Sequence, residues 1–239
     1  MLEGTKLSKH FGSHCVLDAA DVAVQPGKIT AVIGPSGSGK TTLLRALSLL
    51  DAPDAGTVAI DDRKYEFPQA SALTLRPWPQ VTVVFQQHFL WPHLTVRENI
   101  LLPVRRRADT EEDLALLCRA LQIRPFLERY PNEVSLGERQ RAAIARAVML
   151  RPRYLLMDEI TSALDVEQIS AILRFLPLLK ERGVGIMLIT HHLQFAAKMA
   201  DQVIMLDRGV VVDCGSARIL SSPSSPRLRA FLSEIALAA

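Results

Sequence analysis

Eight residues in the first fifth of the chain have the types and spacing that bind phosphate. The run from Gly34 to Thr41 spells GPSGSGKT and satisfies the pattern G-x-x-x-x-G-K-[ST]. Glycines let backbone N–H groups close around phosphate oxygens, and the N-terminus of a following helix adds partial positive charge. A glycine turn that happens to carry a lysine is the alternative. The run predicts that a nucleoside triphosphate is bound by Gly34, Pro35, Ser36, Gly37, Ser38, Gly39, Lys40, Thr41 and Thr42, with Thr41 also contacting its Mg²⁺.

The flanks of this run decide between the two interpretations. The apolar, β-branched run 29–33 precedes it and has the length of a buried strand. Leu43, Leu47 and Leu50 follow at helical spacing. Strand, glycine loop and helix in this order form the context that a phosphate loop requires, so Lys40 is expected to reach the β- and γ-phosphates and the Thr41 hydroxyl to ligate Mg²⁺.

Two adjacent acids end another apolar run. Leu155 to Met157 leads directly into Asp158 and Glu159. Carboxylates at the end of a buried strand are costly unless a cation lies beside them, and a nucleotide-bound Mg²⁺ meets that need. Asp158 is then expected to hold the metal and Glu159 to act on the water that attacks the γ-phosphate. A salt bridge at the strand end is the alternative, and the upstream phosphate loop favours the metal.

His191 and Gln86 also follow predicted strands. Open α/β sheets bind their ligands at the carboxyl ends of strands. His191, after the run 186–190, is placed to contact the γ-phosphate, whereas a surface position is the simpler interpretation of one histidine beside His192. Gln86, after the run 81–85, could bind both metal and water or simply end its strand.

Ser135 and Glu138 fit the helix-capping pattern S-x-x-E ahead of an alanine-rich run. In such a box the serine side chain accepts from the backbone of residue 138, and the glutamate bonds back to residue 135. Capping alone would explain both residues. The functional interpretation is a helix N-terminus that presents donors to a phosphate.

Bulk composition limits the class of protein. The 239 residues are 49% hydrophobic and carry a net charge of +3, which fits a globular α/β protein and excludes a mainly disordered one. No dense basic face argues for nucleic acid. Three widely spaced cysteines, no signal-like N-terminus and no apolar run near ~20 residues predict a reduced, cytosolic protein that would serve a membrane only through a partner.

The elements that position these side chains alternate between strand and helix. The segment 5–33 predicts short strands, 68–79 a surface loop with three prolines, and 92–149 a mainly helical region. A helix over roughly 166–182 should kink at Pro177, and 203–212 predicts a hairpin before one last helix. No repeat or linker divides the chain. The alternation argues for a mainly parallel core sheet.

Together these motifs resemble the ATP-binding subunit of ABC transporters over essentially the whole chain. Residues 134–138 match the place of the signature motif, Gln86 the Q-loop, Asp158 and Glu159 the Walker B pair, residues 162–165 the D-loop, and His191 the switch histidine. The resemblance implies that ATP is the nucleotide and that Phe11, in the place of the aromatic that stacks on adenine, and Val16 contact it. It also implies that Ser135, Gly137 and Glu138 bind the ATP of a second copy.

The fold and partners are likewise implied by the resemblance. It implies an α/β fold, a P-loop NTPase (RecA-like) core with an antiparallel β-subdomain and an inserted helical subdomain. The divisions are β-subdomain and core over 1–86, helical subdomain over 87–150 and core over 151–239. It also implies a head-to-tail homodimer across ATP, which would contact membrane permease subunits through residues 91–96 and, through them, a solute-binding protein. The chain would be a peripheral subunit at the cytoplasmic face of the membrane, and no nucleic acid is expected as a partner.

Three positions depart from the family pattern. Leu136 replaces a signature glycine, Glu138 the usual glutamine, and Ile160 a common proline. None removes a catalytic side chain, so a competent ATPase is expected. The motifs look most like polar amino acid importers. An exporter or lipoprotein-release ATPase, a non-transport ABC ATPase acting on DNA or ribosomes, and a kinase using the same loop are the alternatives.

Overall fold

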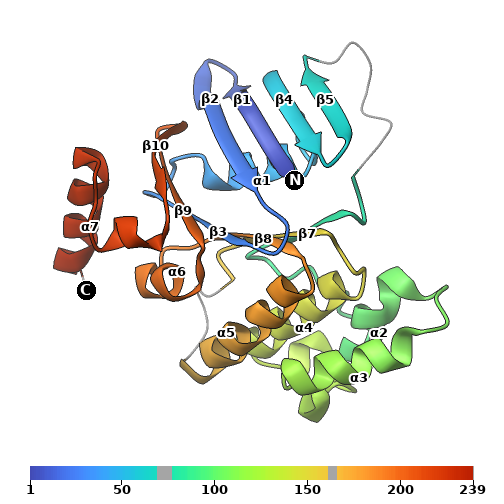
Figure 1. Cartoon of the computed structure of the whole chain (residues 1–239). Coiled ribbons are helices and arrows are strands. Elements are labelled where there is room, and N and C mark those ends of the chain that lie inside the picture. The colour runs from blue at the N-terminus through green and yellow to red at the C-terminus, as the bar shows by residue number, and fades with distance from the viewer. Residues whose placement is uncertain (69–76, 161–165, 239) are drawn as a thin grey trace.

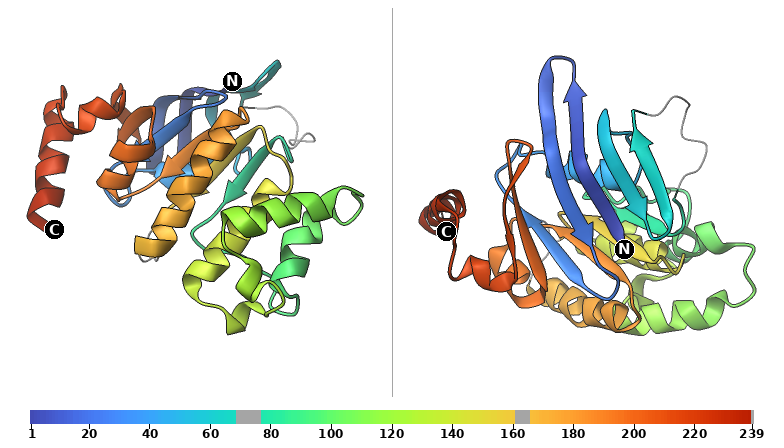
Figure 2. Two further views of the ribbon diagram at one scale, coloured as in Figure 1. Left: turned by 60° about the horizontal axis from the view of Figure 1, so that its bottom comes forward. Right: turned by 45° about the horizontal axis from the view of Figure 1, so that its top comes forward.

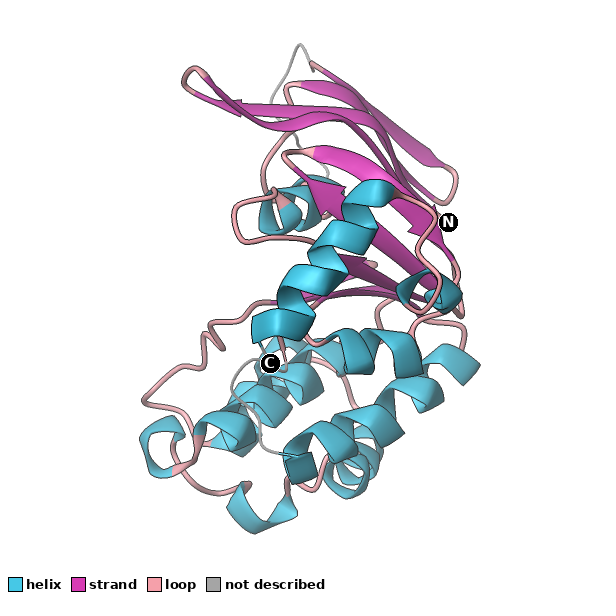
Figure 3. Ribbon diagram, turned by 90° about the vertical axis from the view of Figure 1, so that its left-hand side faces the viewer, coloured by secondary structure: helices cyan, strands magenta, loops and turns pink. Residues whose placement is uncertain are grey.

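The computed structural model describes residues 1–68, 77–160 and 166–238. They form two sheets with helices below and beside them (Figure 1). Seen from the side, both sheets lie above the main group of helices (Figure 3). The predicted D-loop at 162–165 and most of the proline-rich segment 68–79 fall outside the described residues. Within the described ranges, no helix is both long and apolar enough to cross a lipid bilayer.

The central sheet has six strands in the order β10-β9-β3-β8-β7-β6. Every neighbouring pair from β9 to β6 is parallel, and β10 pairs antiparallel with β9, so the predicted, mainly parallel sheet and C-terminal hairpin are confirmed. The strands are β3 (Ile29–Ile33), β6 (Val81–Val84), β7 (Tyr154–Asp158), β8 (Gly185–Ile189), β9 (Gln202–Asp207) and β10 (Val210–Gly215).

Alternation along the central strands supplies two hydrophobic cores. In β7, Leu155 and Met157 join the core that contains the helices beneath the sheet, whereas Tyr154 and Leu156 join the core above it. Successive side chains of a strand point to opposite faces, and a strand covered on both faces is apolar at every position. All five residues of β3, β7 and β8 are accordingly buried.

The second sheet is antiparallel, with the order β2-β1-β4-β5. Its strands are β1 (Leu2–Phe11), β2 (His14–Val24), β4 (Ala55–Ile60) and β5 (Arg63–Phe67). The prediction of short strands in the first 33 residues was wrong for β1 and β2, which have 10 and 11 residues. Register shifts along this pair, with positive φ at Lys6 and Ala19, let the strands bend and continue where the sequence pattern breaks.

The helices divide between the sheets. Helix α1 lies between the two sheets, whereas α4 and α5 lie beneath the central one and α7 stands at the margin away from α2 and α3 (Figures 1 and 2). Helix α5 continues through Pro177, and the predicted kink there stays a prediction. The bounds are α1 (Lys40–Leu47), α2 (Val96–Leu101), α3 (Thr110–Ala120), α4 (Leu136–Val148), α5 (Val166–Glu181), α6 (Leu193–Met199) and α7 (Pro226–Ala238), with 3₁₀ turns η1 (Leu102–Val104), η2 (Arg124–Phe126), η3 (Pro131–Glu133) and η4 (Ala217–Leu220).

Candidate functional site

Four neighbouring parallel strands deliver the predicted side chains to one edge of the central sheet. The phosphate loop follows β3, His191 follows β8, Asp158 ends β7, and Gln86 follows β6. Because the carboxyl ends of parallel strands share an edge, residues more than a hundred positions apart in the chain become neighbours. The structure thus brings the phosphate loop, both acids, the histidine and the glutamine to the same side.

The phosphate loop adopts a backbone that its glycines permit. Gly34 and Gly39 have φ values of 148° and 100°, where L side chains are strained. A Cβ atom on Gly34 would lie 2.0 Å from the Leu206 carbonyl oxygen, and one on Gly39 would lie 2.6 Å from that of Val16. The loop is therefore packed against β9 and β2, while Ser36, Gly37 and Thr41 face solvent.

Lys40 folds back over the loop. Its Nζ atom donates to the carbonyl oxygens of Gly34 and Pro35 at 2.9 and 2.8 Å. The side chain is buried, and this burial lowers the pKa of Lys40. An ammonium group held here by two neutral carbonyl groups, with the Asp158 and Glu159 charges acting to raise its pKa, can turn to a phosphate oxygen.

Thr41 and Asp158 meet at the start of α1. The Thr41 hydroxyl donates to Asp158 Oδ2 at 2.9 Å, and Asp158 is only 5% exposed. Its Oδ1 atom is buried and finds no hydrogen-bond partner within the described residues. Burial raises the pKa of Asp158, and the neighbouring Glu159 charge acts in the same direction. A cation beside this carboxylate would reverse both effects.

This oxygen-rich corner fits Mg²⁺. Hydroxyl and carboxylate oxygens are the protein ligands that Mg²⁺ prefers, and it usually completes its shell with waters and substrate phosphates. No group of three or more His, Cys, Asp and Glu that could hold a metal ion occurs in the part of the chain described. The unpartnered Asp158 Oδ1 is the observation that agrees best with a bound cation.

Glu159 is held in a special conformation. Its φ is 48°, in the left-handed region that a glutamate rarely occupies, and its backbone N–H donates to the Ile189 carbonyl oxygen at 3.0 Å. This turns the side chain toward His191, whose Nε2 atom lies 2.5 Å from Glu159 Oε1. Backbone strain of this kind gathers at functional sites. The contact with His191 fixes the direction of the Glu159 carboxylate.

The predicted adenine contacts lie on the antiparallel sheet. Phe11 ends β1 at a hairpin tip and is 54% exposed, with Lys9 Nζ 5.8 Å from the ring centroid. Val16 is half-buried in β2, and its carbonyl oxygen packs close to Gly39 of the phosphate loop. The hairpin therefore presents an open aromatic face on the strands that border the loop.

The signature residues stand apart from the phosphate loop of the same chain. Ser135, Gly137 and Glu138 lie at the start of α4, beneath the sheet, whereas α1 lies above it (Figure 1). The capping box is present: Glu138 N donates to Ser135 Oγ at 3.2 Å, and Ser135 N donates to Glu138 Oε2 at 2.7 Å. Leu136 begins the helix without a positive φ and with its side chain 43% exposed, so the leucine fits this backbone.

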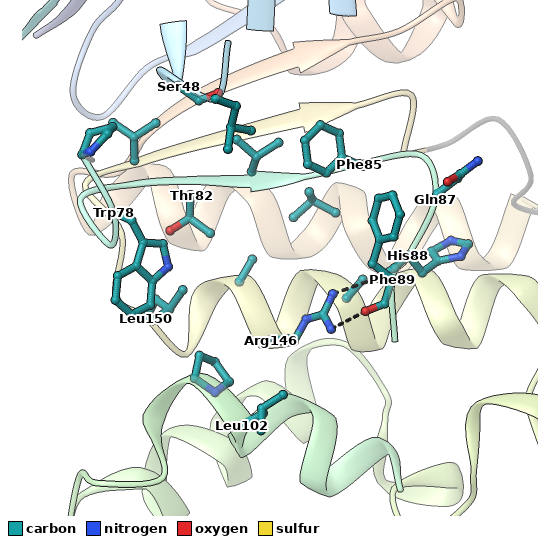
Figure 4. A pocket seen from close by; sticks show the side chains of 18 of the residues that line it. Ser48, Trp78, Thr82, Phe85, Gln87, His88, Phe89, Leu102, Arg146 and Leu150 are labelled. Carbon is teal, nitrogen blue, oxygen red and sulfur yellow. Dashed lines mark hydrogen bonds between the residues drawn. The ribbon is translucent and has the colours of Figure 1, made fainter. Parts of the chain in front are cut away.

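A groove of about 620 Å³ lies outside this site, between the β6 edge of the sheet and α4 (Figure 4). Phe85, Phe89 and Trp78 contribute apolar surface to it, and Arg146 reaches in from α4. Sequence reasoning missed this groove. Three exposed aromatics within fourteen positions, Trp78, Phe89 and Trp91, were the signal that could have found it.

Asn99 is a second residue that sequence reasoning missed. Its side chain is fully buried beneath the segment 91–96. Asn99 Oδ1 accepts from Trp91 N at 2.7 Å, and Nδ2 lies 3.0 Å from the carbonyl oxygens of Trp91, Leu94 and Thr95. One side chain thus fixes the backbone of the predicted contact segment. An asparagine next to helical apolar residues gave no sign of this role.

Comparisons with known proteins agree with this geometry. The ABC transporter family profile matches residues 17–162. The arginine transport ATP-binding protein ArtM of Bacillus subtilis (strain 168) is 39% identical over 98% of this chain and 100% of its own length. The glutamine transport ATP-binding protein GlnQ and the L-cystine transport system ATP-binding protein TcyN, both of Escherichia coli (strain K12), are 38% and 39% identical, covering 98% and 99% of this chain and 100% and 98% of their own lengths.

Solved structures show the same fold. The ATP-binding cassette MJ0796, solved as a dimer in a post-hydrolysis state bound to ADP and Pi, superposes with a TM-score of 0.79. It is 31% identical, and the match covers 91% of this chain and 99% of that one. The fold is therefore the predicted one, a parallel RecA-like core with an antiparallel β-subdomain and helices inserted between β6 and β7. The chain belongs to the ABC transporter family, as one of its ATP-binding, ATP-hydrolysing subunits.

Proposed function

We propose that this chain hydrolyses ATP to energise the import of a polar amino acid. The observation that carries the proposal is full-length similarity, at 38–39% identity, to proteins named for arginine, glutamine and cystine transport, in a chain that retains every predicted catalytic side chain. The class of amino acid follows from these relatives alone, because this chain contributes the ATPase rather than the solute pocket.

At the ATP site, Lys40 and the backbone of residues 34–42 bind the phosphates, and Phe11 and Val16 contact the adenine. Thr41, Asp158 and Gln86 would hold Mg²⁺, which would neutralise phosphate charge when bound. Glu159 orients and activates the attacking water as a general base. The Nε2 atom of His191, 2.5 Å from Glu159 Oε1, steadies that carboxylate. The His191 imidazole is also the proposed contact to the γ-phosphate.

The site is completed by a second copy. Ser135, Gly137 and Glu138 lie on the opposite face of the central sheet from α1, so their use at a nucleotide requires another chain. A head-to-tail homodimer supplies them, and the related MJ0796 cassette was solved as a dimer. The capping box aims the first turn of α4 at the partner's ATP, with donors from its backbone.

The groove beside β6 is the proposed binding site for a helix of the membrane permease. Its lining is mostly apolar, and Phe89 and Trp78 are 62% and 58% exposed. Exposed aromatics gathered in a groove mark interaction sites, and an amphipathic permease helix matches both the shape and the apolar surface. Because Gln86 precedes this groove, a helix bound there would lie next to the ATP site.

We further propose that the chain divides as predicted, into β-subdomain and core over 1–86, helical subdomain over 87–150 and core over 151–239. Through the permease it would sit peripherally at the cytoplasmic face of the membrane, with a solute-binding protein acting from the other side.

The test is reconstitution with the membrane permease subunits that co-purify with this chain. The complex is placed in lipid vesicles with its solute-binding protein, and ATP hydrolysis is measured with arginine, glutamine or cystine. Stimulation by one of these amino acids, with uptake into the vesicles, supports the proposal. Stimulation by a lipoprotein or by an exported compound instead, or hydrolysis that ignores every membrane component, would overturn it.

A further inference from the structure

Arg146 joins α4 to the backbone segment that follows Gln86. Its Nη2 atom donates to the His88 carbonyl oxygen at 2.7 Å, and its Nη1 atom donates to the Phe89 carbonyl oxygen at 2.8 Å (Figure 4). The two acceptors are consecutive in the chain and 58 and 57 residues from the arginine. One planar guanidinium thus spans two neighbouring peptide groups.

The backbone of residues 85–90 depends on hydrogen bonds from outside this segment. Residues 85–90 belong to no strand or helix, so their carbonyl groups lack the partners of a regular ladder. Phe89 has a φ of 47°, an uncommon conformation for an aromatic residue. Its ring packs edge-on against Phe85 at 5.9 Å between centroids. Contacts with other parts of the chain therefore determine the backbone conformation of this segment.

A second contact comes from the same helix. The side chain of His88 lies beside Gln140, which is buried in α4. Burial also lowers the pKa of Arg146, as expected for a guanidinium withdrawn from water. Hydrogen bonds made by a charged donor away from water are strong ones. The two hydrogen bonds of Arg146 therefore fasten the segment to α4.

The other end of α4 carries Ser135. Arg146 lies eleven residues beyond Ser135, a distance of about 16 Å along a rigid helix. Under the proposed function, Gln86 serves the ATP of this chain and Ser135 serves the ATP of its partner. The permease groove, which Arg146 also lines, lies beside the segment.

We propose that Arg146 is a positioning residue that fastens the segment 86–90 to α4, so that a permease helix in the groove moves Ser135 together with Gln86. This inference rests on the proposed function and deepens it. Arg146 contacts neither nucleotide nor metal in this scheme. It makes the two nucleotide sites respond to one membrane partner.

The chemistry requires an arginine. A lysine keeps the charge, but its single ammonium group cannot match two adjacent carbonyl oxygens as a planar fork does. Arg146→Lys and Arg146→Met should therefore behave alike. Arg119→Met is the matched control, since Arg119 is an exposed arginine on α3.

Hydrogen exchange on the isolated full-length chain tests the contact without any membrane partner. Both Arg146 variants should speed amide exchange in peptides covering residues 86–91 at least fivefold, and Arg119→Met should not. Exchange that stays at the wild-type rate in both Arg146 variants would overturn the inference, whatever the transport assays show.

The second measurement is made in the reconstituted transporter. The ratio of solute-stimulated to basal ATP hydrolysis should fall at least tenfold in both Arg146 variants, with Lys failing to rescue. A merely structural role would lower both rates together and leave the ratio as in wild type, and that result would overturn the coupling. If solute does not stimulate ATP hydrolysis by the wild-type complex, the proposed function is wrong. The hydrogen-exchange measurement then tests by itself whether Arg146 holds the segment 86–90.

Discussion

The Nε2 atom of His191 lies 2.5 Å from Oε1 of Glu159, a contact made across the neighbouring strands β8 and β7. Glu159 makes this contact from a backbone with a φ of 48°. A carboxylate held in this way is aimed before any substrate arrives, which reduces the reorganisation needed for water activation. The contact joins the assigned base to the group that would contact the γ-phosphate.

Glu159→Gln should abolish turnover while keeping ATP binding. The amide cannot accept the proton of the attacking water, so kcat should fall by about 10²- to 10⁴-fold. Steady-state ATP hydrolysis measures the loss, and gel filtration with ATP should show a trapped dimer. Wild-type hydrolysis by this variant would remove Glu159 from its assigned role. His191→Ala, which frees the carboxylate, should also slow kcat.

Lys40→Ala should weaken ATP binding at least tenfold. The variant removes a charged donor that is already positioned over the loop, and one such hydrogen bond contributes about 1.5–3 kcal/mol. Titration with a fluorescent ATP analogue gives the affinity. Lys198→Ala is the control, because Lys198 is exposed on α6. Unchanged affinity in Lys40→Ala would count against the phosphate cradle.

Leu136→Gly should give no gain in ATPase rate. Leu136 already has a helical backbone, so a glycine relieves no strain and instead costs up to about 1 kcal/mol of helix stability. The rate is measured at protein concentrations that allow dimers to form. A clear increase would mean that the leucine side chain, 43% exposed beside the capping box, obstructs dimer closure.

Asn99→Ala should destabilise the segment 91–96. The change leaves Trp91 N and the Leu94 carbonyl oxygen without the Asn99 side chain, whereas the Trp91 and Thr95 carbonyl oxygens keep backbone donors, so the cost is about 1–3 kcal/mol for each of the two groups that water cannot reach. Urea unfolding measures the stability, and Trp91 emission should shift to the red. Asn132→Ala, at an exposed position, is the control. Equal stability of the two variants would contradict the assigned role of Asn99.

From the low pKa of Asp61 we predict that the free energy of unfolding falls in acid. Burial alone would raise its pKa, but hydrogen bonds from the N-terminal ammonium, Tyr154 and Arg153 hold that pKa at about 2. The unfolded carboxyl takes up its proton at higher pH than the folded one, so this contribution is present above about pH 4 and is lost as the pH falls toward about 2.

Asp61→Asn should accordingly lower the free energy of unfolding by about 2 kcal/mol at pH 7. The difference from wild type should shrink as the pH falls below about 4, which urea unfolding at several pH values will show. A difference that stays constant down to pH 3 would mean that packing, rather than charge, explains the effect.

Local patterns predicted most of the fold. The runs 29–33 and 155–157 are buried at every position and almost entirely apolar, because both faces of the central sheet are covered, so they were found directly. Strand β5 was not predicted, since only Tyr65 and Phe67 are buried in a strand that also carries three charged residues. The lengths of β1 and β2 depend on bulges, which leave no periodic signal.

The functional site, like the fold, was only partly predictable from the sequence. The phosphate loop, Gln86, Asp158, Glu159 and His191 could be placed because each follows or ends a predicted strand, and the shared edge of the sheet then brings them together. Arg146 could not be assigned, because an arginine in an alanine-rich helix suggests an exposed face, and its acceptors are backbone carbonyls more than fifty residues away. Any residue type can supply a backbone carbonyl oxygen, so the sequence gives no sign of which residues accept from Arg146.

The pairing of β3 has a consequence for the order of assembly during synthesis. Its partners in the central sheet are β8 and β9, which begin more than 150 residues later in the chain. The antiparallel sheet, by contrast, is complete within the first 67 residues. Pairing between distant segments is slow, and a nascent chain folds its early units first. The strand that leads into the phosphate loop must therefore wait for the last third of the chain to emerge from the ribosome, so a prematurely terminated product would lack an ordered nucleotide site.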